Sequence, residues 1–139
     1  MRLPNFLFAF ISKLAKIPTF KTIIIWSLTH MPFVLPLKPI LKNSEWSAFR
    51  HPNPIYEFHL LLLPRKAIET PLELADQDPL LLKSLLLMVN KLVEDFQLEN
   101  QGYRMIINGG GYQDFPLLHV HLVSGEMKKP TQLQENDEK

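Results

Sequence analysis

Two histidines lie one residue apart in the apolar stretch LLHVHLV, residues 117–123. Imidazole titrates near neutral pH, so His119 and His121 can each act as a base, a nucleophile or a metal ligand. Side chains alternate between the two faces of a strand, which places both rings on one face, about 6–7 Å apart. The residues that alternate with them form an apolar face that is expected to pack on a helix (Leu118, Val120 and Leu122).

Three interpretations of this pair are open from the stretch alone. The rings can be a structural pair satisfied by hydrogen bonds, they can hold a metal ion, or one ring can attack phosphorus and form a covalent intermediate. A zinc site needs a third or fourth ligand, and no local spacing selects one among the other histidines, His30, His51 and His59. The chain has no cysteine, which excludes disulfides, thiolate metal sites and a thiol nucleophile.

Neighbouring residues favour phosphate as the group that these histidines address. Asn108 ends the stretch GYRMIIN, three glycines follow at 109–111, and Gln113 stands at the entry to the histidine stretch. Side-chain amides and loop N–H groups are neutral donors suited to phosphate oxygens. The glycine run is a weak signal by itself.

Hydrophobic patterning predicts the elements that must position these residues. Residues 58–64, 102–108 and 116–123 are predicted strands, and residues 36–49 are predicted to form two short strands around a turn at Asn43. A capping-box pattern at 70–73 predicts a short helix. Asp78 begins a long helix, in which apolar residues recur every three or four positions (Leu81, Leu85, Val89, Leu92 and Phe96). This order predicts an α+β fold with an antiparallel sheet and helices packed on one side.

The N-terminal part of the chain has its own charge pattern. Among the 139 residues, a length typical of one domain, positions 1–44 hold six basic residues and no acidic one. Such a basic, apolar segment suggests an anionic surface as partner, either a membrane or nucleic acid. Its longest uncharged run, residues 22–37, is too short and too proline-rich to span a membrane, and no secretory cleavage pattern is present. Residues 5–17 keep helical spacing, which predicts a helix that packs on the domain or on a partner, or lies on a membrane.

Taken together, GYRMIIN and QDFPLLHVHLVSG resemble the histidine triad (HIT) superfamily, in particular its Hint branch of purine-nucleotide phosphoramidases. The signature of that family is a strand H-φ-H-φ-H-φ-φ, with φ an apolar residue, preceded by a glutamine and followed by a glycine. AFRHPNPIYEFHLLLLPRKAI is similar to the family's strand, proline-containing loop, strand and P-K/R turn. The resemblance covers about residues 40–126. It implies a HIT-like fold with about five antiparallel strands, one long helix and one short helix.

The resemblance also divides the chain into three parts. Residues 39–126 are expected to form the HIT-like domain, residues 1–38 a basic, apolar, helical extension, and residues 127–139 a polar, disordered tail. Family members of the Hint type are homodimers that pair along the long helix and the neighbouring strand, so a homodimer is expected. A cytoplasmic location is expected, with peripheral membrane contact through the extension as a further expectation and no nucleic-acid partner.

Only two of the three signature histidines are present. His119 lies six residues after Gln113 and six before Gly125, and in Hint-type motifs those separations belong to the central histidine, the nucleophile. This register makes His121 the third histidine and Leu117 the replacement of the first. The alternative register, with His121 as nucleophile, breaks both separations.

The resemblance implies a metal-free and cofactor-free mechanism on a purine nucleotide or a nucleotide conjugate. His119 attacks the α-phosphorus, and water releases the nucleoside monophosphate from the nucleotidyl-histidine. His121 and Gln113 complete the catalytic set, and the remaining implied contacts are to phosphate and sugar (Asn108, Asp114), to the base (Phe49, Pro52) and, where the family has an aspartate, to the ribose (His51). Because Leu117 and His51 depart from the family, the alternative is a nucleotide-binding or scaffold protein with weakened or lost catalysis.

Overall fold

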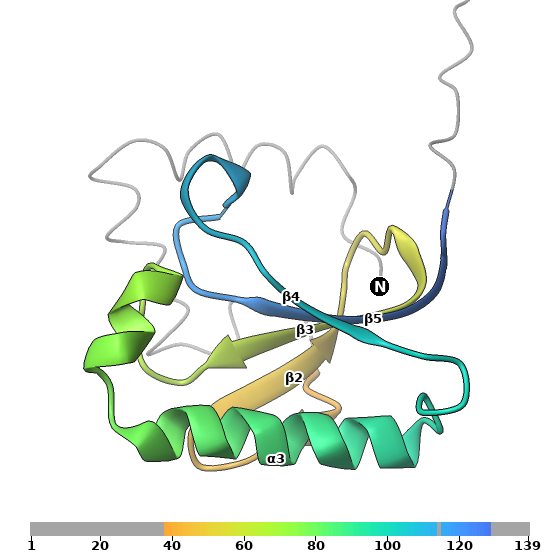
Figure 1. Ribbon diagram of the computed structural model, residues 1–139, viewed down its shortest axis with the longest axis horizontal. Helices are drawn as coiled ribbons and strands as arrows, with labels where there is room; N and C mark the ends of the chain where they lie inside the picture. The colour runs from red at the N-terminus through yellow and green to blue at the C-terminus, as the bar shows by residue number, and fades with distance from the viewer. Residues whose placement is uncertain (1–37, 114, 129–139) are drawn as a thin grey trace, which may run out of the picture.

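A five-stranded antiparallel sheet forms the centre of the chain in the computed structural model, which describes residues 38–113 and 115–128 (Figure 1). Its strands, in the spatial order β1-β2-β3-β5-β4, are β1 (Leu41–Lys42), β2 (Trp46–Arg50), β3 (Tyr56–Pro64), β5 (Val120–Met127) and β4 (Arg104–Ile107). This confirms the α+β class and the antiparallel sheet. Asp114, the helical extension predicted before Lys38 and the tail from residue 129 lie outside the described residues.

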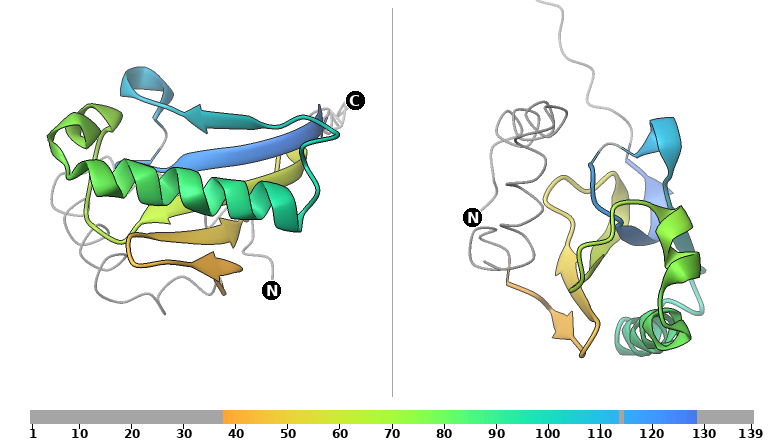
Figure 2. Two further views of the ribbon diagram at one scale, coloured as in Figure 1. Left: turned by 60° about the horizontal axis from the view of Figure 1, so that its bottom comes forward. Right: turned by 90° about the vertical axis from the view of Figure 1, so that its left-hand side faces the viewer.

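One long helix, α3 (Pro79–Asp95), lies across one face of the sheet (Figure 2). It begins where predicted, because the Asp78 side chain accepts a hydrogen bond from the Leu80 backbone N–H at 2.9 Å. Its apolar stripe packs on side chains of the sheet and of the segment just before β5 (Leu81, Leu85, Met88, Val89 and Leu92 against Leu60, Leu62, Leu118, Val120 and Leu122). The predicted apolar face of the histidine stretch therefore does pack on the helix.

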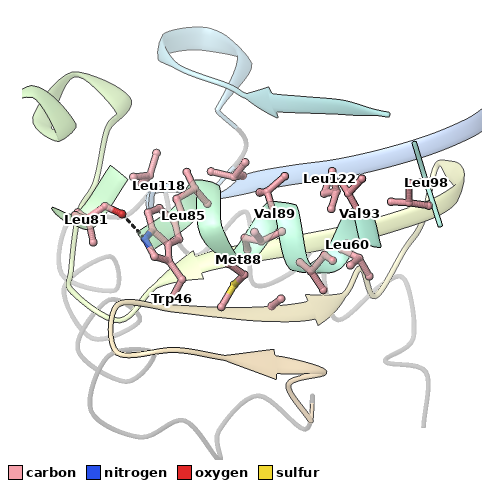
Figure 3. Packing of buried hydrophobic residues seen from close by; sticks show 14 of the residues in the cluster. Trp46, Leu60, Leu81, Leu85, Met88, Val89, Val93, Leu98, Leu118 and Leu122 are labelled. Atoms are coloured by element: carbon pink, nitrogen blue, oxygen red, sulfur yellow. Dashed lines mark hydrogen bonds between the residues drawn. The ribbon is translucent and has the colours of Figure 1, made fainter. Parts of the chain in front are cut away.

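The indole of Trp46 joins helix and sheet at one end of this core. Its Nε1–H donates to the Leu81 carbonyl at 2.9 Å, and the ring is fully buried (Figure 3). The turn before it forms as predicted, since Asn43 Oδ1 accepts from the backbone N–H groups of Glu45 and Trp46 at 2.9 and 2.7 Å. In the described ranges, no helix is both long and apolar enough to cross a membrane.

The predicted short helix is a 3₁₀ helix, η1 (Pro71–Asp76). Its capping box differs from the usual reciprocal pattern. The Thr70 hydroxyl donates to Glu73 Oε1 at 3.1 Å, while Glu73 Oε2 accepts from the Glu69 backbone N–H at 3.2 Å instead of from Thr70. A second 3₁₀ turn, η2 (Gly110–Tyr112), occupies the glycine run.

The last strand is shifted along the chain from its predicted position. β5 begins at Val120 and continues to Met127, so residues 117–119 precede the strand. The reason lies in the backbone partners, because Leu118 donates its N–H to the Ile68 carbonyl at 2.8 Å, beyond the end of β3. His119 thus lies at the junction between a loop and the sheet, whereas His121 lies within the sheet.

Candidate active site

The face of the sheet opposite α3 carries the histidine pair. Residues paired across antiparallel strands point to the same face, and His121 pairs with Leu61 on β3 and with Ile106 on β4. Leu61 in turn pairs with Phe49 on β2. Phe49, which was predicted to contact the base, therefore lies in the same cross-strand row as His121.

A second row brings two more histidines to this face. His59 on β3 pairs with Val123, two residues from His121, and His51 donates its backbone N–H to the His59 carbonyl at 3.0 Å. The rings of His51 and His59 stack with centroids 4.0 Å apart and planes at 17°. The His59 and His121 centroids are 5.1 Å apart, and those of His119 and His121 are 4.9 Å apart.

Asn108 lies at the neighbouring strand end. Ile107, the last residue of β4, pairs with Val120, the first residue of β5. Asn108 follows the one and His119 precedes the other, so both residues lie at the same end of the β4–β5 pair. Four segments of the chain therefore contribute to one group of residues.

A hydrogen bond fixes the orientation of the His119 ring. Nδ1 lies 2.8 Å from the Leu117 carbonyl oxygen, and the residue as a whole is 8% exposed. A carbonyl oxygen can only accept, so Nδ1 carries the proton and Nε2 of the neutral ring carries the lone pair. The backbone of Leu117 provides this contact, while its apolar side chain is buried.

A chain of hydrogen bonds sets the protons of the other two rings. The Ile55 backbone N–H donates to His59 Nδ1 at 3.2 Å, which leaves the proton of the neutral His59 ring on Nε2. His59 Nε2 lies 2.9 Å from His121 Nδ1 and donates to it. The neutral His121 ring then carries its own proton on Nε2. His119 therefore has a lone pair, and His121 a donor, at the Nε2 position.

Burial favours the neutral form of two of these histidines. Desolvation lowers the pKa of His59 to about 3, and electrostatic repulsion by His51, His121 and Lys128 adds to the effect. Burial lowers the pKa of His51, and repulsion from His119 lowers it further. A backbone hydrogen bond with Asn53 partly offsets this by raising the pKa. Neutral rings are required for the alternating donor and acceptor pattern described above.

The remaining predicted residues lie at the edges of this group. The Gln113 side-chain amide donates to the Glu69 carbonyl, which fixes the glutamine at the end of η2. Pro52 is half-buried in the loop between β2 and β3, next to His51. Asp114, predicted beside the phosphate, is outside the described residues.

His59 is the residue that the sequence did not select. Strand alternation puts it on the same face of β3 as Leu61, but this says nothing about which strand is the neighbour. Its participation follows from the pairing of β3 with β5, which joins residues 62 positions apart in the chain. One nitrogen from each of His51, His59 and His121 lies within 4.8 Å of the other two, so this trio could also hold a metal ion.

Comparison with known proteins extends these observations. The model of the HIT domain family matches residues 33–128, well over half of the chain. The chain belongs to the HIT domain family. An uncharacterized HIT-like protein of Buchnera aphidicola is 33% identical over 95 residues, which are 67% of this chain and 85% of the relative.

Solved structures of HIT proteins share the fold. A HIT family hydrolase from Legionella pneumophila has a TM-score of 0.64 and 30% identity, over 73% of this chain and 90% of that one. A histidine triad protein from Clostridium difficile has a TM-score of 0.65 over 77% of this chain and 92% of that one, and its 24% identity supports the fold alone. The HIT-like fold predicted from the sequence is thus confirmed.

Proposed function

We propose that this HIT protein is a hydrolase or nucleotidyl transferase of the Hint type, which cleaves a nucleoside phosphoramidate or another nucleotide conjugate. The observation that carries the proposal is the hydrogen bond from His119 Nδ1 to the Leu117 carbonyl, because it leaves the nucleophilic lone pair on Nε2. The Legionella relative, described as a HIT family hydrolase, supports the reaction class.

In the proposed reaction, His119 Nε2 attacks the α-phosphorus in line. A P–N bond to His119 forms, the bond from phosphorus to the leaving group breaks, and the leaving amine takes up a proton from solvent. Water then attacks the nucleotidyl-histidine, the P–N bond to His119 breaks, and the nucleoside monophosphate leaves. One proton of this water returns to solvent and the His119 ring is again neutral. His121 donates its Nε2–H to a phosphate oxygen, where negative charge accumulates in the transition state.

His59 acts in this scheme as a positioning residue. Its bond to His121 Nδ1 determines that the His121 proton resides on Nε2, where the phosphate needs a donor. Asn108 and Gln113 are proposed to contribute further polar contacts, with Asp114 beside them.

The nucleoside is proposed to lie on the β2 side of the histidines. Phe49 and Pro52 supply the apolar walls for a purine base. His51 Nδ1 accepts from the Asn53 backbone N–H at 3.1 Å, so the neutral His51 ring offers an Nε2–H donor to the sugar. An aspartate would accept from both ribose hydroxyls, whereas this histidine donates, which predicts weaker ribose binding than in family members with the acid.

The decisive experiment is release of a nucleoside monophosphate from a phosphoramidate in the presence of a chelator. His119→Ala is expected to abolish turnover, and a trapped nucleotidyl adduct is expected to map by mass to His119. Full turnover by His119→Ala would exclude the proposal. An adduct on His121 would instead select the other register of the motif.

A second candidate is nucleotide binding with weakened or lost catalysis. Leu117 favours it, since this side chain cannot supply the imidazole of the family's first histidine. In that case a purine nucleotide raises the melting temperature of the protein while no phosphoramidate is cleaved. Cleavage that depends on His119 would rule this candidate out.

We further propose that the protein forms a homodimer through α3 and β4. One face of α3 is in the core, but four leucines of the helix are between 47% and 64% exposed (Leu80, Leu82, Leu86 and Leu87). Among the described residues, β4 is an edge strand of the sheet, and a sheet edge is a surface on which another chain can associate.

Peripheral membrane contact through the basic extension is also proposed. Its support is the sequence, in which apolar residues and lysines alternate on a predicted helix over residues 5–17. Flotation with anionic liposomes is expected for the full chain and not for a chain that starts at residue 31. Equal flotation of both chains would exclude this role for the extension.

A further inference from the structure

Three histidines converge beside the proposed nucleophile, from the residue after β2, from β3 and from β5. One ring nitrogen each of His51, His59 and His121 lies within 4.8 Å of the other two. His59 Nε2 and His121 Nδ1 are already 2.9 Å apart, and His51 is stacked on His59 with ring centroids at 4.0 Å. His119 is not a member of this trio.

We infer that His51, His59 and His121 form a binding site for one divalent transition-metal ion such as Zn²⁺. Zinc binds imidazole nitrogens at about 2.0–2.1 Å, which places the nitrogens of a tetrahedral site about 3.4 Å apart. The nitrogens of His59 and His121 are 2.9 Å apart, slightly closer than in such a site, and the nitrogen of His51 lies within 4.8 Å of both. Small rotations of the rings therefore bring the three nitrogens to the distances of a tetrahedral site. The fourth position remains for water or another ligand.

The chemistry of the donors determines which ions fit. Three imidazoles suit Zn²⁺, Co²⁺, Ni²⁺ and Cu²⁺, whereas Mg²⁺ and Ca²⁺ prefer oxygen ligands. The third imidazole comes from His51, the residue that replaces an acid of the related family. This chain can therefore present an all-nitrogen set.

Binding of the ion rearranges the hydrogen bonds of the metal-free state. The ion takes the place of the proton that His59 donates to His121. The proton of the neutral His59 ring moves to Nδ1, so the Ile55 N–H loses its acceptor there. His51 also gives up the hydrogen bond that its Nδ1 accepts from the Asn53 N–H, because Nδ1 must either bind the ion or carry the proton of the neutral ring. Three hydrogen bonds are thus exchanged for three metal–nitrogen bonds.

The location of the ion has a consequence for activity, which rests on the proposed function. An ion held between His51 and His121 occupies the space assigned to the sugar and the phosphate. Zinc is therefore expected to inhibit phosphoramidate cleavage in competition with the nucleotide. Binding itself is measured without any nucleotide, and cleavage is measured with chelator, so either idea can fail while the other stands.

The test is a titration of the chelator-treated, full-length protein with Co²⁺, followed by its d–d absorption, with Zn²⁺ as competitor. One ion per chain is expected, confirmed by elemental analysis after removal of free metal. His51→Ala and His59→Ala are each expected to weaken binding at least about tenfold, because each removes one of three ligands.

His119→Asn is the matched control, since it alters a histidine of the same face that is not in the trio. It is expected to bind Co²⁺ with unchanged affinity while it loses turnover. Absence of saturable binding, equal affinity of the His51→Ala protein, or loss of binding in His119→Asn would each overturn the inference. His51 is only half-buried, so its variant remains informative if His59→Ala does not fold.

Discussion

At the scale of single residues, the backbone of Leu117 matters more than its side chain. The carbonyl of this residue holds His119 Nδ1 at 2.8 Å, and any residue at position 117 can supply a carbonyl. In the proposed register of the motif, this buried leucine takes the position of the first signature histidine. Under that proposal the orientation of the nucleophile is preserved, because it depends on the backbone carbonyl.

This leads to a prediction for two substitutions. Leu117→His is expected to change the rate of phosphoramidate cleavage by no more than about tenfold, since the carbonyl contact is unchanged. His119→Ala is expected to lower kcat by about a thousandfold or more, as for loss of a covalent nucleophile. Measured kcat values for both variants check this, and a rise of several hundredfold in Leu117→His would show that the missing imidazole limits the reaction.

The pKa of His59 predicts how stability depends on pH. Burial and neighbouring charge lower the pKa from 6.5 to about 3 in the folded state, so the unfolded chain takes up the proton first as the pH falls. Folding stability is then lost from about pH 6.5 downward, by at most about 1.4 kcal/mol per pH unit from this residue.

Denaturant unfolding of the chelator-treated protein at pH 7, 6 and 5 measures this dependence. His59→Asn is expected to be less stable at pH 7 and to lose less stability between pH 7 and pH 5. Parallel pH profiles for the two proteins would contradict the predicted neutrality of the folded His59 ring.

At the scale of elements, the position of β5 depends on its two ends. Before the strand, Leu118 bonds to Ile68, which turns His119 away from regular pairing. Toward its end, the register against β3 shifts between Tyr56 and Phe58, and Gly125 adopts a φ of +77°. The strand is therefore fixed on both sides of the histidines, which contributes to holding the His121 ring against His59.

Substitutions of two glycines test how the C-terminal end of β5 is held in place. Gly125 and Gly102 both have positive φ, but an added Cβ at Gly125 would overlap the Glu57 side chain, while at Gly102 nothing lies within 4 Å. Gly102→Ala is expected to cost about 1–2 kcal/mol from backbone strain, and Gly125→Ala more, because Glu57 must also move. Denaturant unfolding of both variants measures the difference, and equal losses would show that Glu57 adapts freely.

At the scale of the whole molecule, the two faces of the sheet differ in what they contact. One face is covered by α3 and forms the hydrophobic core, in which each fully buried leucine contributes about 1.5–3 kcal/mol. The other carries the histidines. The proposed catalytic side chains thus lie on or beside a sheet that is packed against α3 on its opposite face.

The exposed leucines of α3 predict the oligomeric state. The protein is expected to be a dimer by light scattering at micromolar concentration, and Leu86→Glu is expected to produce monomers, because the charge opposes burial of the helix face. Lys66→Glu, at an exposed position outside α3 and β4, is the control for a change of charge alone. A monomeric native protein would contradict the proposed dimer.

The sequence by itself determined the local features of this protein. Helical spacing identified α3, an Asn-Ser turn separated β1 from β2, and strand alternation put His119 and His121 on the face that α3 does not cover. These features depend on residues within a few positions of one another, where periodicity and turn chemistry act. The motif spacings pointed to the HIT family for the same reason.

Only the tertiary structure decided which residues meet. His59 bonds to His121 because β3 and β5 are neighbours in the sheet, and the two residues are 62 positions apart in the chain. The start of β5 and the proton positions of the rings likewise follow from backbone partners at Ile68 and Ile55, outside the motif. Strand pairing depends on packing of the whole core, and no local pattern in the sequence specifies it.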